Sequence, residues 1–216
     1  MHVIKVEARP QAWHEAAAEH AAVNHAGWWA AYKCDVGRYV AYGGGGALKQ
    51  ILTQQGLWAL LQFRVASAIH RSRLPHPLKR PILVFCVVWR KCMEVITGIS
   101  LPYTARIGRG LYIGHYGNVI LNEKAVLGCF CNISQGVTIG VSGRGEKRGV
   151  PVIGNRVFIG ANAVVAGAVM VGDDSVIGAN SLVITEVPPA STFVGVPAVR
   201  SSDRGSEDYL SPSAGL

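Results

Sequence analysis

The sequence predicts a parallel β-helix over residues 101–200, preceded by an α-helical region over residues 1–100. Three observations lead to this fold class. An aliphatic residue recurs at every sixth position in the second half, apolar residues before it have helical spacing, and a charged, glycine-rich segment interrupts the repeat. A period of six fits neither the 3.6-residue period of a helix nor the alternation of a hairpin. It fits short strands wound into a coil.

The repeat is most regular in its later part. The hexads IGNRVF, IGANAV, VAGAVM, VGDDSV, IGANSL and VITEVP follow one another without a gap. We expect the first residue of each hexad to stack inward from coil to coil, and glycine in the second position to allow tight corners. The first residues are Ile153, Ile159, Val165, Val171, Ile177 and Val183, and the column extends back to Ile107.

Two steps in the column are longer than six. The step from Val119 to Leu127 is eight residues, and the step from Ile139 to Ile153 is fourteen. The longer step contains VSGRGEKRGVPV, which has three glycines and four charged residues and cannot form a buried strand. We therefore predict a loop at 141–152 that leaves the coil. Loops on rigid scaffolds are common places for binding and chemistry.

The region before the repeat has helical patterns. Residues 10–33 are rich in alanine, and residues 48–72 and 78–97 carry apolar residues at helical spacing. Gly98 supplies a stop after the last of these helices. We expect the helices to cover the first coil. The polar, serine-rich segment 201–216 is expected to be a flexible tail.

Composition narrows the functional classes. No apolar run reaches the length of a membrane span, and the N-terminus lacks a secretory pattern, so we expect a cytoplasmic protein. The five cysteines form no CxxC pair, which disfavours disulfides and zinc. The net charge is +8, and residues 36–93 contain nine Lys or Arg but no Asp or Glu. This stretch could face an anionic membrane or an acidic chain, whereas no motif indicates nucleic acid.

One histidine is set apart from the others. Six of the seven lie in the helical region, and only His115 lies in the repeat, as the third residue of IGHYGN after Gly114. At this position a side chain points away from the coil interior. Histidine, with an ordinary pKa of about 6.5, is a natural general base near neutral pH. The spacing alone leaves two interpretations open, a surface residue or a catalytic base.

The motifs resemble a known family. ARIGRGLYIGHYGNVILNEKAVLGCFCNISQGVTIG, the charged loop, IGNRVFIGANAVVAGAVMVGDDSVIGANSLV, VPP and VGVPA resemble the hexapeptide-repeat acetyltransferases, within them the serine acetyltransferase branch and its polysaccharide-modifying relatives. The resemblance implies a left-handed β-helix, a homotrimer or a dimer of trimers, and acetyl-coenzyme A in the groove between subunits. No metal is expected, because the cysteine spacing and the single histidine of the repeat offer no zinc site. The resemblance makes His115 the catalytic base and Gly140, Ser142, Ala161 and Ala179 the lining of the pantetheine path.

Departures from the family's pattern leave the acceptor open. Gly114 stands where the family has Asp, residues 149–151 where it has Arg-His-Pro, and Ser100 where it has the carboxylate that orients the imidazole. Asp35 is the remaining candidate to bind an amino-acid acceptor, and Glu123 is a candidate to orient the base. The acceptor is then L-serine, in the first step of cysteine biosynthesis, or a sugar hydroxyl of a polysaccharide. The second would give the basic helices a role at the inner face of a membrane.

Other functions of this fold fit less well. A zinc carbonic anhydrase needs several histidines in the repeat, which has one. A non-catalytic scaffold or ice-binding surface needs regular ladders, which the charged loop and the histidine interrupt. A nucleotidyltransferase needs a glycine-rich nucleotide-binding domain before the repeat, which is missing here.

Overall fold

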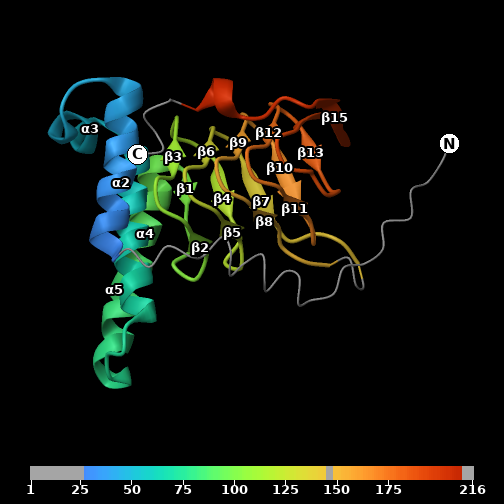
Figure 1. Ribbon diagram of the computed structural model, residues 1–216. Coiled ribbons are helices and arrows are strands. Elements are labelled where there is room, and N and C mark those ends of the chain that lie inside the picture. Colours follow the sequence, from blue (N-terminus) through green and yellow to red (C-terminus); the bar gives the residue numbers. More distant parts are fainter. Residues whose placement is uncertain (1–26, 145–147, 211–216) are drawn as a thin grey trace.

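A computed structural model describes residues 27–144 and 148–210, in which four helices stand at one end of a β-helix (Figure 1). The order of elements confirms the predicted fold class. No helix in these ranges combines the length and hydropathy needed to cross a bilayer. The helices are α2 (Trp28–Gly43), α3 (Ala47–Thr53), α4 (Gln55–Arg71) and α5 (His76–Thr97).

The β-helix is a prism of three parallel sheets, which the chain visits in the order B, C, A in each coil. Sheet A contains β1 (Ile99–Ser100), β4 (Val119–Leu121), β7 (Thr138–Gly140), β10 (Val164–Ala166) and β13 (Leu182–Val183). Sheet B contains β2 (Arg106–Ile107), β5 (Val126–Leu127), β8 (Val152–Ile153) and β11 (Met170–Val171). Sheet C contains β3 (Tyr112–Ile113), β6 (Asn132–Ile133), β9 (Phe158–Ile159), β12 (Val176–Ile177), β14 (Thr192–Gly195) and the antiparallel β15 (Ala198–Ser202).

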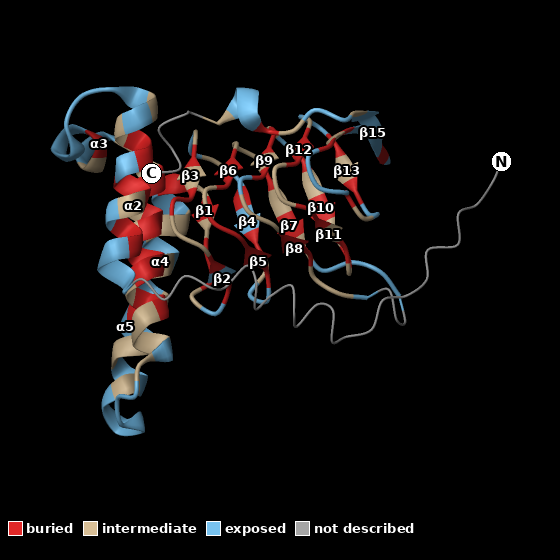
Figure 2. Cartoon of the chain, viewed as in Figure 1, coloured by how far each residue is buried: buried red, intermediate tan, exposed pale blue. Residues whose placement is uncertain are grey.

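The sheet register places the first residues of the hexads directly above one another. In sheet B, Ile107 pairs with Leu127, Leu127 with Ile153, and Ile153 with Val171. All four side chains are buried, and Figure 2 shows the buried residues along the inside of the prism. The aliphatic column is therefore the core, as predicted. The predicted loop at 141–152 corresponds to the connection between β7 and β8, except that Val152 is already the first, buried residue of β8.

The corners explain two features of the hexad. A Cβ on Gly128 would lie 2.5 Å from the backbone carbon and oxygen of Gly154 in the next coil. Most second-position glycines are thus required by close contact between coils, and not by a positive φ, whereas Gly114 and Gly140 have room for a Cβ. The left-handed φ falls instead on the fourth residue of most hexads, where Asn and Asp are tolerated best. Examples are Arg156, Asn162, Asp174 and Asn180, with φ between 53° and 59°.

The helices cover the first coil, as predicted. Leu57, Leu60 and Phe63 of α4 are almost fully buried and belong to the same hydrophobic cluster as Ile99 and Ile113 of the first coil. Two boundaries differ from the prediction. The segment 48–72 forms two helices that meet at Gln54, and the helical region ends at residue 97 because β1 already pairs with β4. The start of the predicted helix 10–33 lies outside the described residues.

The expected tail begins later than predicted. β15 continues to Ser202, and the short 3₁₀ helix η2 (Glu207–Tyr209) follows it. The Ser206 N–H donates to the Asp174 carbonyl at 2.8 Å, and the ring of Tyr209 lies 4.7 Å from that of Phe158 on sheet C. Residues 201–210 are therefore packed against the β-helix, which corrects the prediction of a flexible segment there. Residues 211–216 lie outside the described part.

Candidate active site

His115 lies in the corner between β3 of sheet C and β4 of sheet A, and its side chain is exposed. This corner differs from the regular ones. Its left-handed residues are Gly117 and Asn118, the fifth and sixth of the hexad, with φ of 103° and 50°. The Gly117 N–H donates to the carbonyl of Thr97 at the end of α5, at 2.9 Å. The helical cap thus shapes the corner that holds the histidine.

The strand before His115 is fixed by a tyrosine from the cap. The hydroxyl of Tyr39 in α2 donates to the Ile113 carbonyl and accepts from the Ile113 N–H, both at 3.0 Å. Burial raises the pKa of Tyr39, so the hydroxyl keeps its proton at neutral pH. A Cβ on Gly56 would lie 2.1 Å from the Tyr39 oxygen, so only glycine fits there. Two helices therefore hold the backbone two residues before the candidate base.

Two predicted coenzyme contacts share an edge of the prism with His115. Ala161 and Ala179 are third residues of their hexads, like His115 and Gln135, and occupy the same corner in later coils. Backbone hydrogen bonds run along this edge, from Asn162 to Gln135 at 2.9 Å and from Asn180 to Ala161 at 2.8 Å. Strand spacing puts the two alanines about 10 and 14 Å from the histidine level. The small side chains leave room for an extended ligand along this edge.

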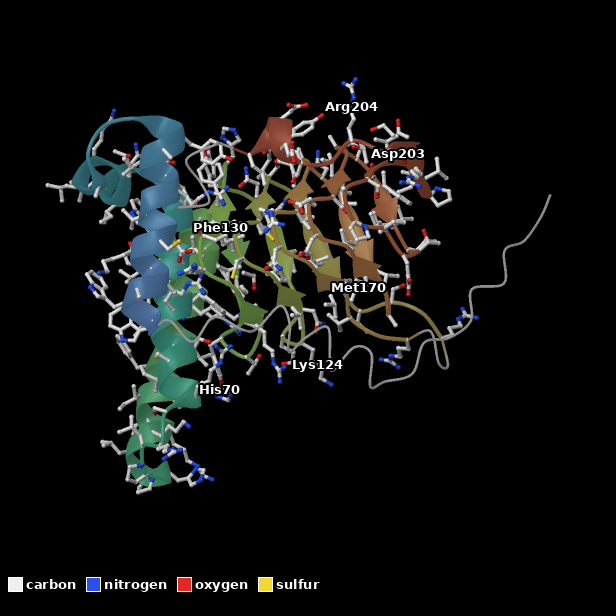
Figure 3. All side chains as sticks on the ribbon, viewed as in Figure 1. His70, Lys124, Phe130, Met170, Asp203 and Arg204 are labelled. Carbon is white, nitrogen blue, oxygen red and sulfur yellow. The ribbon has the colours of Figure 1, made fainter. Side chains whose placement is uncertain are left out.

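The other predicted contacts lie on a different edge. Gly140 ends β7 and Ser142 begins the loop to β8, between sheets A and B, where Ser142 and Gly149 exchange backbone hydrogen bonds of 3.2 and 3.1 Å. Glu123 lies on the same edge, in the turn after β4. Figure 3 shows its neighbour Lys124 pointing away from the prism there. The width of sheet A separates this edge from His115. Glu123 and His115 therefore lie on different edges of one chain, and the role of Glu123 in orienting His115 stays a prediction.

Asp35 has a structural role. Its side chain is fully buried, and its oxygens accept hydrogen bonds from Arg64 Nε at 2.9 Å and Nη2 at 3.0 Å. The Leu111 N–H donates to the same carboxylate at 3.0 Å. Arg64 also donates to the carbonyls of Ile107 and Gly108, at 2.8 and 2.7 Å. The prediction that Asp35 binds the acceptor is wrong, because this carboxylate ties the cap to the first coil.

The sequence did not predict a polar pair between β1, the first strand of sheet A, and the end of α5. The Ser100 hydroxyl donates to Glu94 Oε1 at 2.7 Å, and Glu94 is also paired with Lys91 at 2.6 Å and Arg90 at 3.3 Å. The two residues are six apart across a helix end, which no spacing rule singles out. Among the described residues, none is hydrogen-bonded or ion-paired to the imidazole of His115.

The described residues contain no group of three or more His, Cys, Asp or Glu side chains placed to hold a metal ion.

Residues 151–185 match the family model of the bacterial transferase hexapeptide, with six repeats. A prism of hexapeptide coils with a histidine at the corner beside small third-position residues is the architecture of a hexapeptide-repeat transferase. Similar sequences identify the family more narrowly.

A serine acetyltransferase of Helicobacter pylori is 39% identical over 151 residues, which cover 68% of this chain and 82% of that protein. The chain belongs to the serine acetyltransferase family. A Brucella abortus serine acetyltransferase in complex with coenzyme A has a TM-score of 0.72 at 27% identity, over 82% of this chain and 69% of the other. A Neisseria gonorrhoeae serine acetyltransferase in complex with serine has a TM-score of 0.70 at 28% identity, over 81% and 69%. The family predicted from the motifs is confirmed.

Proposed function

We propose that the protein is an acetyl-coenzyme A-dependent O-acetyltransferase that acetylates the hydroxyl of L-serine. The observation that carries this proposal is the 39% identity to a serine acetyltransferase over most of that enzyme's length. The relatives solved with coenzyme A and with serine support both substrates. The structure gives further support, because His115, Ala161 and Ala179 lie in line along one edge of the prism.

His115 is the general base in this mechanism. Its imidazole removes the proton of the acceptor hydroxyl while the oxygen attacks the thioester carbonyl carbon. The tetrahedral intermediate carries a negative oxygen, which needs an N–H donor at the site. When the intermediate collapses, the carbon–sulfur bond breaks and the imidazolium returns its proton to the departing thiolate. The products are the O-acetyl ester and coenzyme A.

The site we propose is completed in a homotrimer. His115, Ala161 and Ala179 lie on one edge of sheet A, and Gly140 and Ser142 lie on the other. Rotation about a threefold axis parallel to the prisms can bring the first edge of one subunit to the second edge of the next. The outer face of sheet A is suited to contact, since Ile120 in β4 and Ile184 directly after β13 are each about half exposed. Such a rotation leaves each coil at the same height along the axis. Glu123 of a neighbour would therefore lie at about the height of His115.

A saccharide hydroxyl is the second candidate acceptor. It is favoured by the burial of Asp35, which leaves no predicted carboxylate to bind the ammonium group of an amino acid. A site that lacks such partners discriminates poorly in favour of a zwitterion.

The test is release of the coenzyme A thiol from acetyl-coenzyme A with L-serine as the sole acceptor. We expect turnover above the hydrolysis rate without acceptor, and a loss of about 10²- to 10⁴-fold in His115→Ala. His76→Ala is the matched control, since it removes an exposed histidine from the helical cap. Binding of acetyl-coenzyme A without turnover of serine would reject serine as acceptor and favour the saccharide. Activity of His115→Ala within a few-fold of wild type would reject the base.

A further inference from the structure

Helix α5 carries a large apolar surface that the rest of the described chain leaves uncovered. Six of its aliphatic and aromatic side chains are more than half exposed, and spacings of three, four and seven residues place them on one side of the helix. We name this surface the α5 face. Its residues are Leu78, Val84, Phe85, Val88, Val95 and Ile96.

The opposite side of α5 already has its partner. Cys86 is buried, and its carbonyl accepts a hydrogen bond from Gln62 Nε2 of α4 at 3.2 Å. Figures 1 and 2 show the first turns of α5 projecting past the β-helix, with little of their surface buried. The α5 face is therefore not part of the packing between cap and prism. Contiguous exposed apolar surface of this kind usually marks an interaction site.

The charge around the α5 face is positive. Arg73 and Arg80 are exposed near the start of the helix, and Lys91 is exposed two turns before its end. Glu94 is the single carboxylate of α5, and it is already paired with Arg90 and Lys91. The α5 face thus combines apolar side chains with cations at its border, the composition of helices that lie in a membrane interface.

We propose that the α5 face binds the surface of an anionic lipid bilayer. This inference goes beyond the proposed function, because acetyl transfer to serine needs no membrane. Apolar side chains would enter the interfacial layer, while Arg73, Arg80 and Lys91 meet lipid phosphates.

A second copy of the chain that pairs through its own α5 is a poorer occupant for the α5 face. In a parallel pairing Arg80 would face Arg80, and in an antiparallel pairing it would approach Arg90 and Lys91 of the other helix. The one carboxylate that could compensate is already paired within its own chain. Like charges brought together oppose association. An anionic surface avoids this repulsion, and each cation at the border of the α5 face is attracted to it.

The experiment is co-sedimentation of the full-length protein with vesicles of phosphatidylcholine alone or mixed with phosphatidylglycerol. We expect binding to the mixed vesicles, weaker binding as salt is raised, and little binding to phosphatidylcholine alone. Phe85→Ser should lower the partition coefficient about tenfold or more, because its ring would no longer enter the interface. Arg80→Gln should lower it about fivefold.

Val199→Ser is the matched control for Phe85→Ser, since Val199 is 61% exposed on β15 at the far end of the prism, close to the 66% of Phe85. It should bind like wild type. The proposal is overturned if mixed vesicles do not sediment the protein, or if Phe85→Ser and Val199→Ser bind equally. It is also overturned if light scattering shows an assembly that Phe85→Ser halves in mass, since a second copy would then cover the α5 face. Acetyl transfer measured without vesicles tests the proposed function separately.

Discussion

Removing one partner of the buried Asp35–Arg64 pair should destabilise the protein strongly without a specific effect on substrate affinity. Asp35→Asn keeps the shape of the side chain and an acceptor for the Leu111 N–H, but leaves the Arg64 guanidinium buried without a counter-charge. Breaking a buried ion pair in this way costs about 3–5 kcal/mol. For a chain of this length, each kcal/mol lowers Tm by about 2–4 °C, so a fall of at least 6 °C is expected.

The reciprocal variant and the double variant separate charge from packing. Arg64→Met leaves the carboxylate without its cation and also removes the donors to the Ile107 and Gly108 carbonyls, so it should cost at least as much as Asp35→Asn. The double variant Asp35→Asn/Arg64→Met should cost about 2 kcal/mol less than the sum of the single variants, because no unpaired charge is left.

Urea denaturation followed by circular dichroism measures all three variants, and the KM for each substrate is measured on the folded protein. Single variants that cost less than about 1 kcal/mol, or a double variant that is fully additive, would refute the structural role of the pair. So would an Asp35→Asn protein of normal stability whose KM for the acceptor rises, because that result would restore Asp35 as a substrate contact.

Three further changes have defined outcomes. Tyr39→Phe should lower kcat with little change in KM, because the backbone before His115 loses its clamp; equal kinetic constants would exclude this role. Gly128→Ala should lower the urea midpoint markedly, since its Cβ would lie 2.5 Å from the next coil, whereas Gly37→Ala, in open space on α2, should raise stability by about 0.5–1 kcal/mol. Partial burial raises the pKa of Glu94, but hydrogen bonds from Lys91 and Ser100 and the charge of Arg90 lower it further, below the usual 4.5. The stability advantage over Glu94→Gln should therefore be complete above this value and disappear as pH falls through the lowered pKa; an advantage that persists in acid would contradict the shift.

Much of the fold could be predicted because the hexad reports the coil directly. An inward position must be aliphatic in every coil, and Leu127, Ile153 and Val171 show this without any tertiary information. The loop was visible for the same reason, as an interruption of the period. The fourth-position Asn and Asp were a further signal of the left-handed corners, and they could have been found from the hexads.

The site could be predicted only in part. His115 stands out because it is the single histidine of the repeat, at an outward-facing position, but the roles of Asp35 and Glu123 depended on contacts that the sequence does not encode. Asp35 meets Arg64 29 residues later through helix packing. Glu123 is only eight residues from His115, yet the intervening strand carries it to the next corner of the prism. Nearness in sequence means little where the chain turns a corner about every six residues.

The spacing between paired strands shows how freely this scaffold can change its loops. Ile120 pairs with Thr138 after 18 residues, Ile107 with Leu127 after 20, and Leu127 with Ile153 after 26, yet the same column is kept. Each added residue is absorbed at a corner, and a longer loop costs little extra closure entropy. A segment transplanted between Val141 and Pro151 would thus leave the core undisturbed. The loop at this corner can therefore be exchanged, or change in length, with little effect on the stability of the aliphatic core.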